Sequence, residues 1–293
     1  MIKNNISRNN QDNISEHHSE KSNGGQPQSL SGLQDLGFIG NKNKIGKKEG
    51  FGIQKWKDGS IYKGNFINGE ADGWGIFYYS DGDIFKGQFA KDIICGYGEY
   101  NNITGVTYYG SFFEDLQSGI GYEIYTDSTT YFGEYKNGKK DGIGTYKYRN
   151  TIVYEGEWKE NNMDGYGIYH FKNGRSYKGQ WKNSKLHGYG EFTWVEGKKY
   201  YGFYKKDLKD GFGIYYWPGN RFFIGFWKEG KQHGISKYIK NNQIKYCKWK
   251  KGKKDKMFFN EDQFFNSFES DEDKYKFFFL WDINKLKEYL EIK

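Results

Sequence analysis

The sequence has few prolines and cysteines and no long apolar run. Its 293 residues include 2 Pro and 2 Cys, and Cys95 and Cys247 match no metal-ligand or redox spacing. We therefore expect no disulfide framework, no metal site and no cofactor. The longest apolar run, Phe277 to Trp281, is much shorter than the roughly 18 residues that a membrane span needs, and the polar N-terminus lacks a signal sequence. These absences predict a soluble cytoplasmic protein.

Catalytic motifs are also missing. No Gly-rich string follows a strand and opens a helix, so the sequence offers no phosphate-binding loop. His187 and His233 occupy equivalent positions of a repeat, where we expect them to form turn or strand-start hydrogen bonds. We see no set of side chains that would act together as acid, base and nucleophile. The sequence therefore predicts a protein that is not an enzyme.

The apolar residues are mainly aromatic, and they recur with glycine at a fixed period. The chain has 27 Tyr, 24 Phe, 9 Trp and 41 Gly. A 23-residue unit begins with Tyr or Phe, has Gly two positions later and a second ring two positions after that. The unit starts are Tyr62, Phe85, Tyr108, Tyr131, Tyr154, Tyr177, Tyr200 and Phe223. Further glycines separated by one residue follow, as at Gly73 and Gly75.

The spacing within a unit predicts a β-hairpin. Alternate residues of a strand share one face, so ring, glycine and ring lie together. Loops such as Lys136 to Lys140 would join the two strands of a unit, and turns such as Asp58-Gly59 would join the units. One hairpin cannot bury its own rings, so we expect the hairpins to stack, with rings lying across the glycines. The predicted fold is all-β, an elongated, twisted single antiparallel sheet with a groove.

The residues that define the unit resemble a known repeat. Tyr-Glu-Gly-Glu-Trp at 154–158, followed by Asp-Gly-Tyr-Gly at 164–167, looks like the MORN repeat. Eight full copies cover residues 62–245, with half repeats on each side. Units two and three depart from the family pattern, because Cys95 and Ser118 stand where the family usually has Asp or His. The resemblance implies a solenoid-like rod, here without an appended enzyme domain.

The composition divides the chain into three parts. Residues 1–45 form an Asn/Ser-rich arm that we expect to be disordered. Residues 46–255 form the repeat array. Residues 256–293 form an acidic and aromatic tail, in which Ile283, Leu286 and Leu290 predict a short amphipathic helix. This helix would either cap the last open strand edge or bind a partner or a second copy.

Charge is distributed unevenly along the repeats. Residues 198–255 hold 16 basic and 4 acidic side chains, whereas residues 70–130 hold 2 and 10. Many late lysines fall in the first loop of a unit, which predicts a basic edge that attracts an anionic surface. An exposed edge of lysines that only keeps the sheet soluble is the alternative. The candidate residues are Lys205, Lys206, Lys209, Lys228, Lys231, Lys250, Lys251, Lys253 and Lys254.

The resemblance implies a non-catalytic scaffold or adaptor. Relatives with stand-alone repeats occur in cytoskeletal, ciliary or axonemal, and membrane-associated assemblies, which predicts such a location or the inner face of a membrane. A partner helix could lie in the aromatic groove, which the late units would line with Trp158, Tyr169, Trp181, Phe192, Tyr204, Tyr215 and Trp227.

Three other roles follow from the charges. The alternative function is a peripheral membrane module that binds anionic phospholipids, phosphoinositides among them, through the lysine edge. The opposite charges of early and late repeats predict an antiparallel homodimer or an equivalent hetero-complex. Nucleic acid is disfavoured as a partner, because no known nucleic-acid-binding module is present. The bias toward Asn, Lys, Tyr and Ile is typical of a protist chain from an AT-rich genome.

Overall fold

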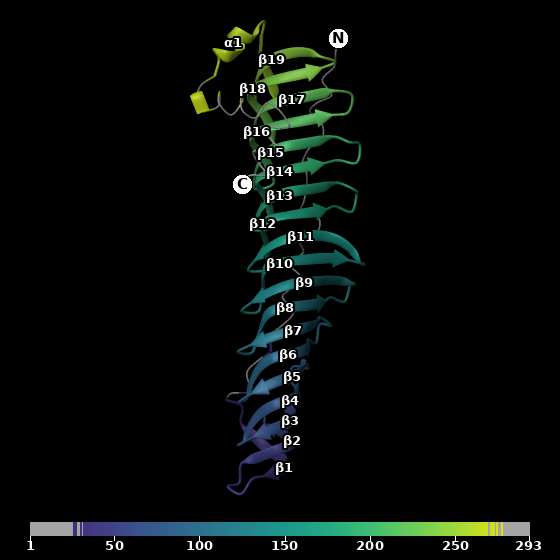
Figure 1. The fold of residues 1–293 in the computed structure, drawn as a ribbon, viewed down its shortest axis with the longest axis vertical. Coiled ribbons are helices and arrows are strands. Elements are labelled where there is room, and N and C mark those ends of the chain that lie inside the picture. Colours follow the sequence, from purple (N-terminus) through teal and green to yellow (C-terminus); the bar gives the residue numbers. More distant parts are fainter. Residues whose placement is uncertain are drawn as a thin grey trace. The chain divides into compact units, whose positions relative to one another are not determined.

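The described part of the chain folds mainly into β-strands, as the repeat predicts. The computed structural model describes residues 26–27, 30, 32–268, 270–272, 274 and 277 (Figure 1). Within these residues, twenty strands belong to one antiparallel sheet, and the short helix α1 follows them. The chain divides into two compact units, Glu20–Asn162 and the part that begins at Met163. The predicted all-β class and single antiparallel sheet are confirmed.

In the first unit, each strand from β1 to β11 pairs with the next one in the sequence. The strands are β1 (Asp35–Lys42), β2 (Lys48–Trp56), β3 (Ile61–Ile67), β4 (Glu70–Tyr78), β5 (Ile84–Ala90), β6 (Ile93–Asn101), β7 (Thr107–Phe113), β8 (Leu116–Ile124), β9 (Thr129–Lys136), β10 (Lys139–Tyr148) and β11 (Thr151–Lys159). Every pair is antiparallel, so each unit of the repeat is a hairpin.

The second unit continues the same pattern from β12 to β20. Its elements are β12 (Asn162–His170), β13 (Ser176–Lys182), β14 (Lys185–Thr193), β15 (Lys199–Lys205), β16 (Leu208–Trp217), β17 (Arg221–Lys228), β18 (Lys231–Lys240), β19 (Gln243–Lys250), β20 (Lys253–Phe258) and α1 (Glu261–Phe265).

The turns inside the hairpins are shorter than the five residues we expected. Lys136 pairs directly with Lys139, so only Asn137 and Gly138 form that turn. Both have positive φ, 50° and 74°, as a two-residue type I′ turn requires. The expectation was wrong because we counted the polar residues around the turn as loop, although they are paired strand residues.

Neighbouring hairpins are also joined through their turns. Leu186 N–H donates to Asp207 Oδ1 at 2.8 Å, and Asp207 N–H donates to the Leu186 carbonyl at 3.0 Å. The same pair of bonds, across 21 residues, links Ile94 to Asp115. The turn of one hairpin thus satisfies backbone groups of the hairpin before it.

The sheet begins earlier than we expected. Strand β1 lies inside residues 1–45, which we predicted to be a disordered arm, and pairs with β2. It is the first strand of an additional hairpin, because the Phe38 ring lies over Gly40 and Gly52. The repeat period did not reveal this hairpin, since Phe38 precedes Tyr62 by 24 residues instead of 23. Leu30 is also buried, against the aromatic cluster of the first unit.

The described part of the tail packs on the sheet. Strand β20 continues to Phe258, beyond the boundary that we predicted at residue 255. Helix α1 then places Phe264, which is fully buried, 4.5 Å from the Tyr246 ring of β19 and 5.1 Å from Phe277. The helix predicted from Ile283, Leu286 and Leu290 lies outside the described residues.

Candidate partner-binding surfaces

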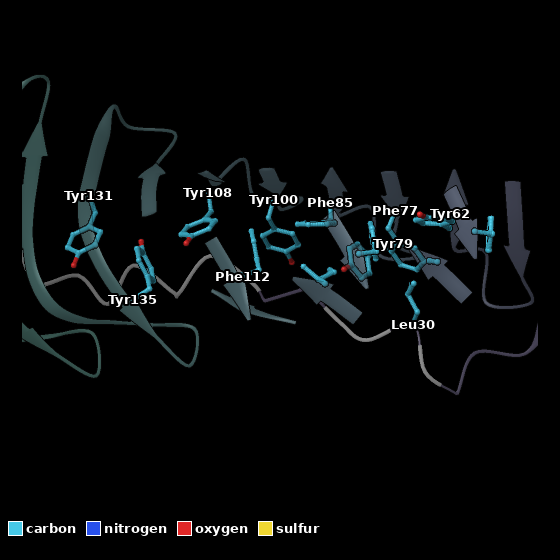
Figure 2. Packing of buried hydrophobic residues seen from close by; sticks show 14 residues of the cluster. Leu30, Tyr62, Phe77, Tyr79, Phe85, Tyr100, Tyr108, Phe112, Tyr131 and Tyr135 are labelled. Atoms are coloured by element: carbon cyan, nitrogen blue, oxygen red, sulfur yellow. The ribbon is translucent and has the colours of Figure 1, made fainter. Parts of the chain in front are cut away.

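One face of the sheet carries the unit-starting rings, and we call it the ring face. In most repeats this ring lies over two glycines that are paired on adjacent strands: Tyr62 covers Gly64 and Gly75, where a Cβ would lie 2.4 Å from a Tyr62 atom. The last repeat differs, because Gly225 is paired with Ser236 there. The Tyr62 hydroxyl donates to the Asn65 carbonyl at 3.1 Å. Figure 2 shows the equivalent rings in sequence, Tyr62, Phe85, Tyr108 and Tyr131. The predicted role of these glycines is confirmed.

The second ring of each unit joins the first rings into a continuous row. Phe112 contacts Tyr108 of its own repeat and Phe85 of the preceding repeat, both at 5.1 Å between ring centroids and both edge to face (Figure 2). Such geometry is favourable for aromatic quadrupoles and adds to the free energy of burial. The row is therefore the core of the first unit.

The rings proposed to line a partner groove lie on the same ring face, Trp158 in the first unit and the other six in the second. Tyr169, Trp181, Phe192, Tyr204 and Tyr215 are buried, from 0% exposed at Phe192 to 7% at Tyr169, whereas Trp158 and Trp227 are half-buried. The expectation of an aromatic groove open to a helix is wrong at the five buried positions. The physical reason is their packing against the rings that lie over the glycines: the ring centroids of Trp181 and Tyr177 are 5.2 Å apart, and those of Tyr204 and Tyr200 are 5.3 Å apart.

One column of the ring face includes a lysine that we assigned to the edge. Its members are the second residue of the second strand of each repeat, and all are buried. Lys209 is 4% exposed, and its Nζ lies 5.2 Å from the centroids of the Trp194 and Tyr200 rings. Lys209 is therefore not available to an anionic surface, which corrects its assignment. The column consists of Ala71, Ile94, Gln117, Lys140, Met163, Leu186, Lys209 and Gln232.

The other eight lysines of the predicted edge are exposed. They lie at or beside the turns β15–β16, β17–β18 and β19–β20, and Lys206 and Lys251 occupy turn positions with φ of 51°. The exposed set is Lys205, Lys206, Lys228, Lys231, Lys250, Lys251, Lys253 and Lys254.

A hollow of about 600 Å³ brings two of these lysines together with residues that the sequence did not single out for binding. Lys228 and Lys250 line it beside Lys248, and Asp210 and Asp255 line it as well. Sequence reasoning missed Lys248 because it looked only at turns, whereas Lys248 lies within strand β19. The basic edge is thus interrupted by carboxylates at this point.

The opposite face of the sheet carries a second periodic row that sequence reasoning missed. It consists of the residue between the two glycines of each second strand, except in β18, where Ser236 stands in place of the second glycine. In β4 the first of these glycines, Gly73, has a φ of 93° at a register shift, and the second, Gly75, lies under the Tyr62 ring. Trp74 between them points away from the rings and is 60% exposed. The signal was present in the sequence, because the position is large and apolar in every unit: Phe51, Trp74, Tyr97, Ile120, Ile143, Tyr166, Tyr189, Phe212 and Ile235.

Six exposed apolar side chains gather on this face over β6 to β10. Tyr122 of β8 is paired with Tyr109 of β7 and with Phe132 of β9, so the three share one face. We call the set the opposite-face patch; its members are Tyr97, Tyr109, Ile120, Tyr122, Phe132 and Ile143, with exposed fractions from 38% to 67%.

The polar groups of the described residues form no metal-binding cluster, and the two thiols are not activated. Within the described residues, no group of three or more His, Cys, Asp and Glu side chains is placed to hold a metal ion. Burial raises the pKa of the Cys95 and Cys247 thiols, which lowers the fraction of reactive thiolate. His233 Nδ1 accepts from the Lys251 N–H at 3.5 Å, as expected for a turn position. No helix in the described part of the chain is long and apolar enough to cross a bilayer.

These features define a β-hairpin repeat protein whose hairpins stack through rings and glycines. The family model of the MORN repeat matches nine segments: residues 44–61, 62–84, 85–102, 108–130, 131–151, 154–174, 177–199, 200–220 and 223–243. The chain therefore belongs to the MORN repeat family. Repeats of this family are generally non-catalytic and mediate protein interactions.

Comparisons beyond the family are distant. No curated protein matches the chain. Among solved structures, the TCP10 domain of Danio rerio CPAP is similar at 12% identity over 65% of this chain and 88% of that chain, with a TM-score of 0.34. The Drosophila melanogaster SAS-4 TCP domain, in complex with a proline rich motif of Ana2, is similar at 13% identity over 69% and 96%, with a TM-score of 0.29. Likenesses this low support no conclusion about function.

Proposed function

We propose that this protein is a non-catalytic scaffold that holds partner proteins in a cytoskeletal, ciliary or axonemal, or membrane-associated assembly. The observation that carries the proposal is the division of surfaces within the MORN hairpin. The rings of the ring face are largely buried in the core, whereas the turn edges and the opposite face expose side chains that recur from repeat to repeat. A repeated external surface suits a protein that binds others.

The location can be tested in the cells that express the protein. A copy tagged at the N-terminus, fused to a proximity-labelling enzyme, should label a defined set of cytoskeletal or ciliary proteins and should sediment with them after detergent extraction. Diffuse distribution with release of all the protein into the detergent-soluble fraction would contradict the scaffold proposal.

A second candidate is binding of anionic phospholipids, as a peripheral membrane module. The observation that favours it is the exposure of eight lysines at the turns of β15 to β20. Near a membrane surface each exposed lysine contributes up to about 1 kcal/mol, and salt weakens the attraction. The carboxylates of Asp210 and Asp255 beside Lys228 and Lys250 oppose it.

Liposome sedimentation separates the two candidates. Vesicles with phosphatidylserine or a phosphoinositide should bind the wild type at low salt, and neutralising Lys205, Lys206, Lys251 and Lys253 to Gln should abolish that binding. Buried Lys209 provides the matched control, because Lys209→Met should leave vesicle binding unchanged. An equal loss of vesicle binding in the four-lysine variant and in Lys209→Met would contradict the assignment to the exposed edge. Absence of binding to any vesicle would rule out the second candidate.

A further inference from the structure

The row of apolar residues on the opposite face is covered beside the tail, in the last strands of the second unit, and exposed in the first unit. In the second unit, Phe212 and Ile235 are only 2% and 6% exposed. They share a buried cluster with Phe264 and Phe277 of the tail, and the Phe212 and Phe277 rings lie 6.1 Å apart. Here an aromatic segment of the chain itself covers the row.

The covering segment and the strands beneath it have opposite charges. The strands lie in residues 198–255, with 16 basic and 4 acidic side chains, whereas Glu261 and Asp262 open α1 and Asp271 and Glu272 follow it. Tyr246 of β19 donates its hydroxyl to Glu261 Oε1 at 2.9 Å. The opposite face of this unit therefore binds a short helical segment that combines aromatic side chains with complementary charge.

In the first unit the same row is exposed. Tyr97, Ile120 and Ile143 are 67%, 52% and 58% exposed, and a second row adds Tyr109, Tyr122 and Phe132 beside them. Paired side chains on adjacent strands lie within about 5.5 Å of each other, so the opposite-face patch is contiguous around Tyr122. Contiguous exposed apolar surface of this kind marks interaction sites.

Acidic side chains surround the patch. Glu134 is paired with Ile120, and its Oε1 also accepts from the Ile143 N–H at 3.0 Å. Glu157 is paired with Ile143, and Glu99 with Tyr109, while Lys86 approaches Glu99 at 3.3 Å. Over residues 70–130 the balance is 10 acidic to 2 basic. The charge is thus the reverse of that beneath the tail.

We propose that the opposite-face patch binds an amphipathic helix of another protein, with Leu or aromatic residues on one side and Lys or Arg on its flanks. A helix suits the site, because the backbone groups of paired central strands are satisfied and only side chains face the partner. The acidic tail of a second copy would meet like charges there and is disfavoured. The inference rests on the scaffold function and names the chemistry of one partner.

The test uses the full chain and three fluorescent 20-residue helical peptides. All have the same Leu and Trp residues on one side, and the other side carries Lys, Gln or Glu. Anisotropy should show the Lys peptide binding at least tenfold more tightly than the Glu peptide, with the Gln peptide between them. The double variant Ile120→Thr and Phe132→Thr should bind the Lys peptide at least tenfold more weakly than the wild type does. The control Ile103→Thr and Val195→Thr changes exposed apolar residues in turns outside the patch and should have no effect.

Three results of the peptide measurements would overturn the inference. They are absence of Lys-peptide binding, equal binding of the Lys and Glu peptides, and equal binding by the patch variant and the wild type. A wild-type dimer that becomes a monomer in the patch variant would assign the patch to a second copy and would also overturn it. If the patch variant still labels the same assembly in cells but no peptide binds, the scaffold function stands and only this partner class fails.

Discussion

Lys140 and Glu123 form a buried ion pair in the core of the first unit. Lys140 Nζ lies 2.6 Å from Glu123 Oε2, and their side chains are 9% and 3% exposed. The hydroxyls of Tyr125 and Tyr135 donate to the same carboxylate oxygen at 2.5 and 3.2 Å. Burial, and then the Glu123 charge, raises the pKa of both tyrosines, which therefore stay neutral donors. In the other repeats, the residue equivalent to Lys140 is mostly apolar, and the residue equivalent to Glu123 is a ring such as Tyr100 or Tyr146.

This pair predicts a strong coupling between two substitutions. Lys140→Leu alone leaves a buried carboxylate without its cation, and we expect a loss of about 3–5 kcal/mol in the free energy of unfolding. Adding Glu123→Tyr restores the residue types of the other repeats and should recover most of that loss. Urea denaturation of the two single variants and the double variant measures the coupling. Additive losses would show that the ion pair is not the source of the effect.

The paired glycines predict a second stability difference. A Cβ at Gly121 would lie 2.3 Å from the Tyr108 ring, so Gly121→Ala must displace a ring that is 1% exposed. We expect a loss of about 1–3 kcal/mol. Gly37 is the matched control, because a Cβ there meets no atom within 4 Å. Gly37→Ala should change the free energy of unfolding by less than about 0.5 kcal/mol. Equal losses would contradict the packing of rings over glycines.

Removal of Phe264 should affect only the strands beneath the tail. Phe264 is fully buried against Tyr246, Phe258 and Phe277. With Phe264→Ala we expect the tail to become sensitive to protease and the amides of β17 to β19 to exchange faster with solvent. The amides of β3 to β6 serve as the internal control and should keep their exchange rates. Faster exchange in both regions would mean that the substitution destabilises the entire sheet.

The contact between Tyr246 and Glu261 predicts a dependence on alkaline pH. Burial, followed by the hydrogen bond to Glu261, raises the pKa of Tyr246 to about 12 from its usual 10.0. Because the pKa is higher in the folded state, the contact contributes stability that is complete below about pH 10 and is lost as pH rises toward 12. Urea unfolding of the wild type and Tyr246→Phe should differ by a constant amount up to pH 10. The difference should shrink above it, and an increase there would contradict the assignment.

The sequence was sufficient to predict the hairpins, the single sheet and the contact of rings with glycines, because period and residue type determine all three. It was not sufficient for Phe38, whose 24-residue spacing breaks the period, or for Lys209, whose charge suggested solvent. Lys209 shows why: its repeat position places it among rings, and the ammonium group lies near the aromatic faces of Trp194 and Tyr200. A long cationic side chain can occupy a core column, which composition alone does not reveal.

The opposite-face row could have been predicted, since the residue that follows the first glycine of each second strand is large and apolar in every repeat. Its exposure could not. Phe212 and Ile235 are buried and Tyr97 and Ile120 are exposed, although they occupy the same repeat position. What differs is whether a distant segment of the chain folds back over them, and this depends on the tail and on contacts far apart in the sequence.

The hydrogen bonds between consecutive hairpins determine how the length of the repeat array can change in evolution. Leu186 with Asp207, and Ile94 with Asp115, are joined by the same atoms across the same 21 residues. A duplication or loss of complete 23-residue repeats therefore recreates the junction that it interrupts, whereas an insertion that shifts this spacing separates the residues that form the two bonds. Genes that encode such arrays can change their number of hairpins in whole steps, and each step alters how far apart two bound proteins are held without requiring a new fold.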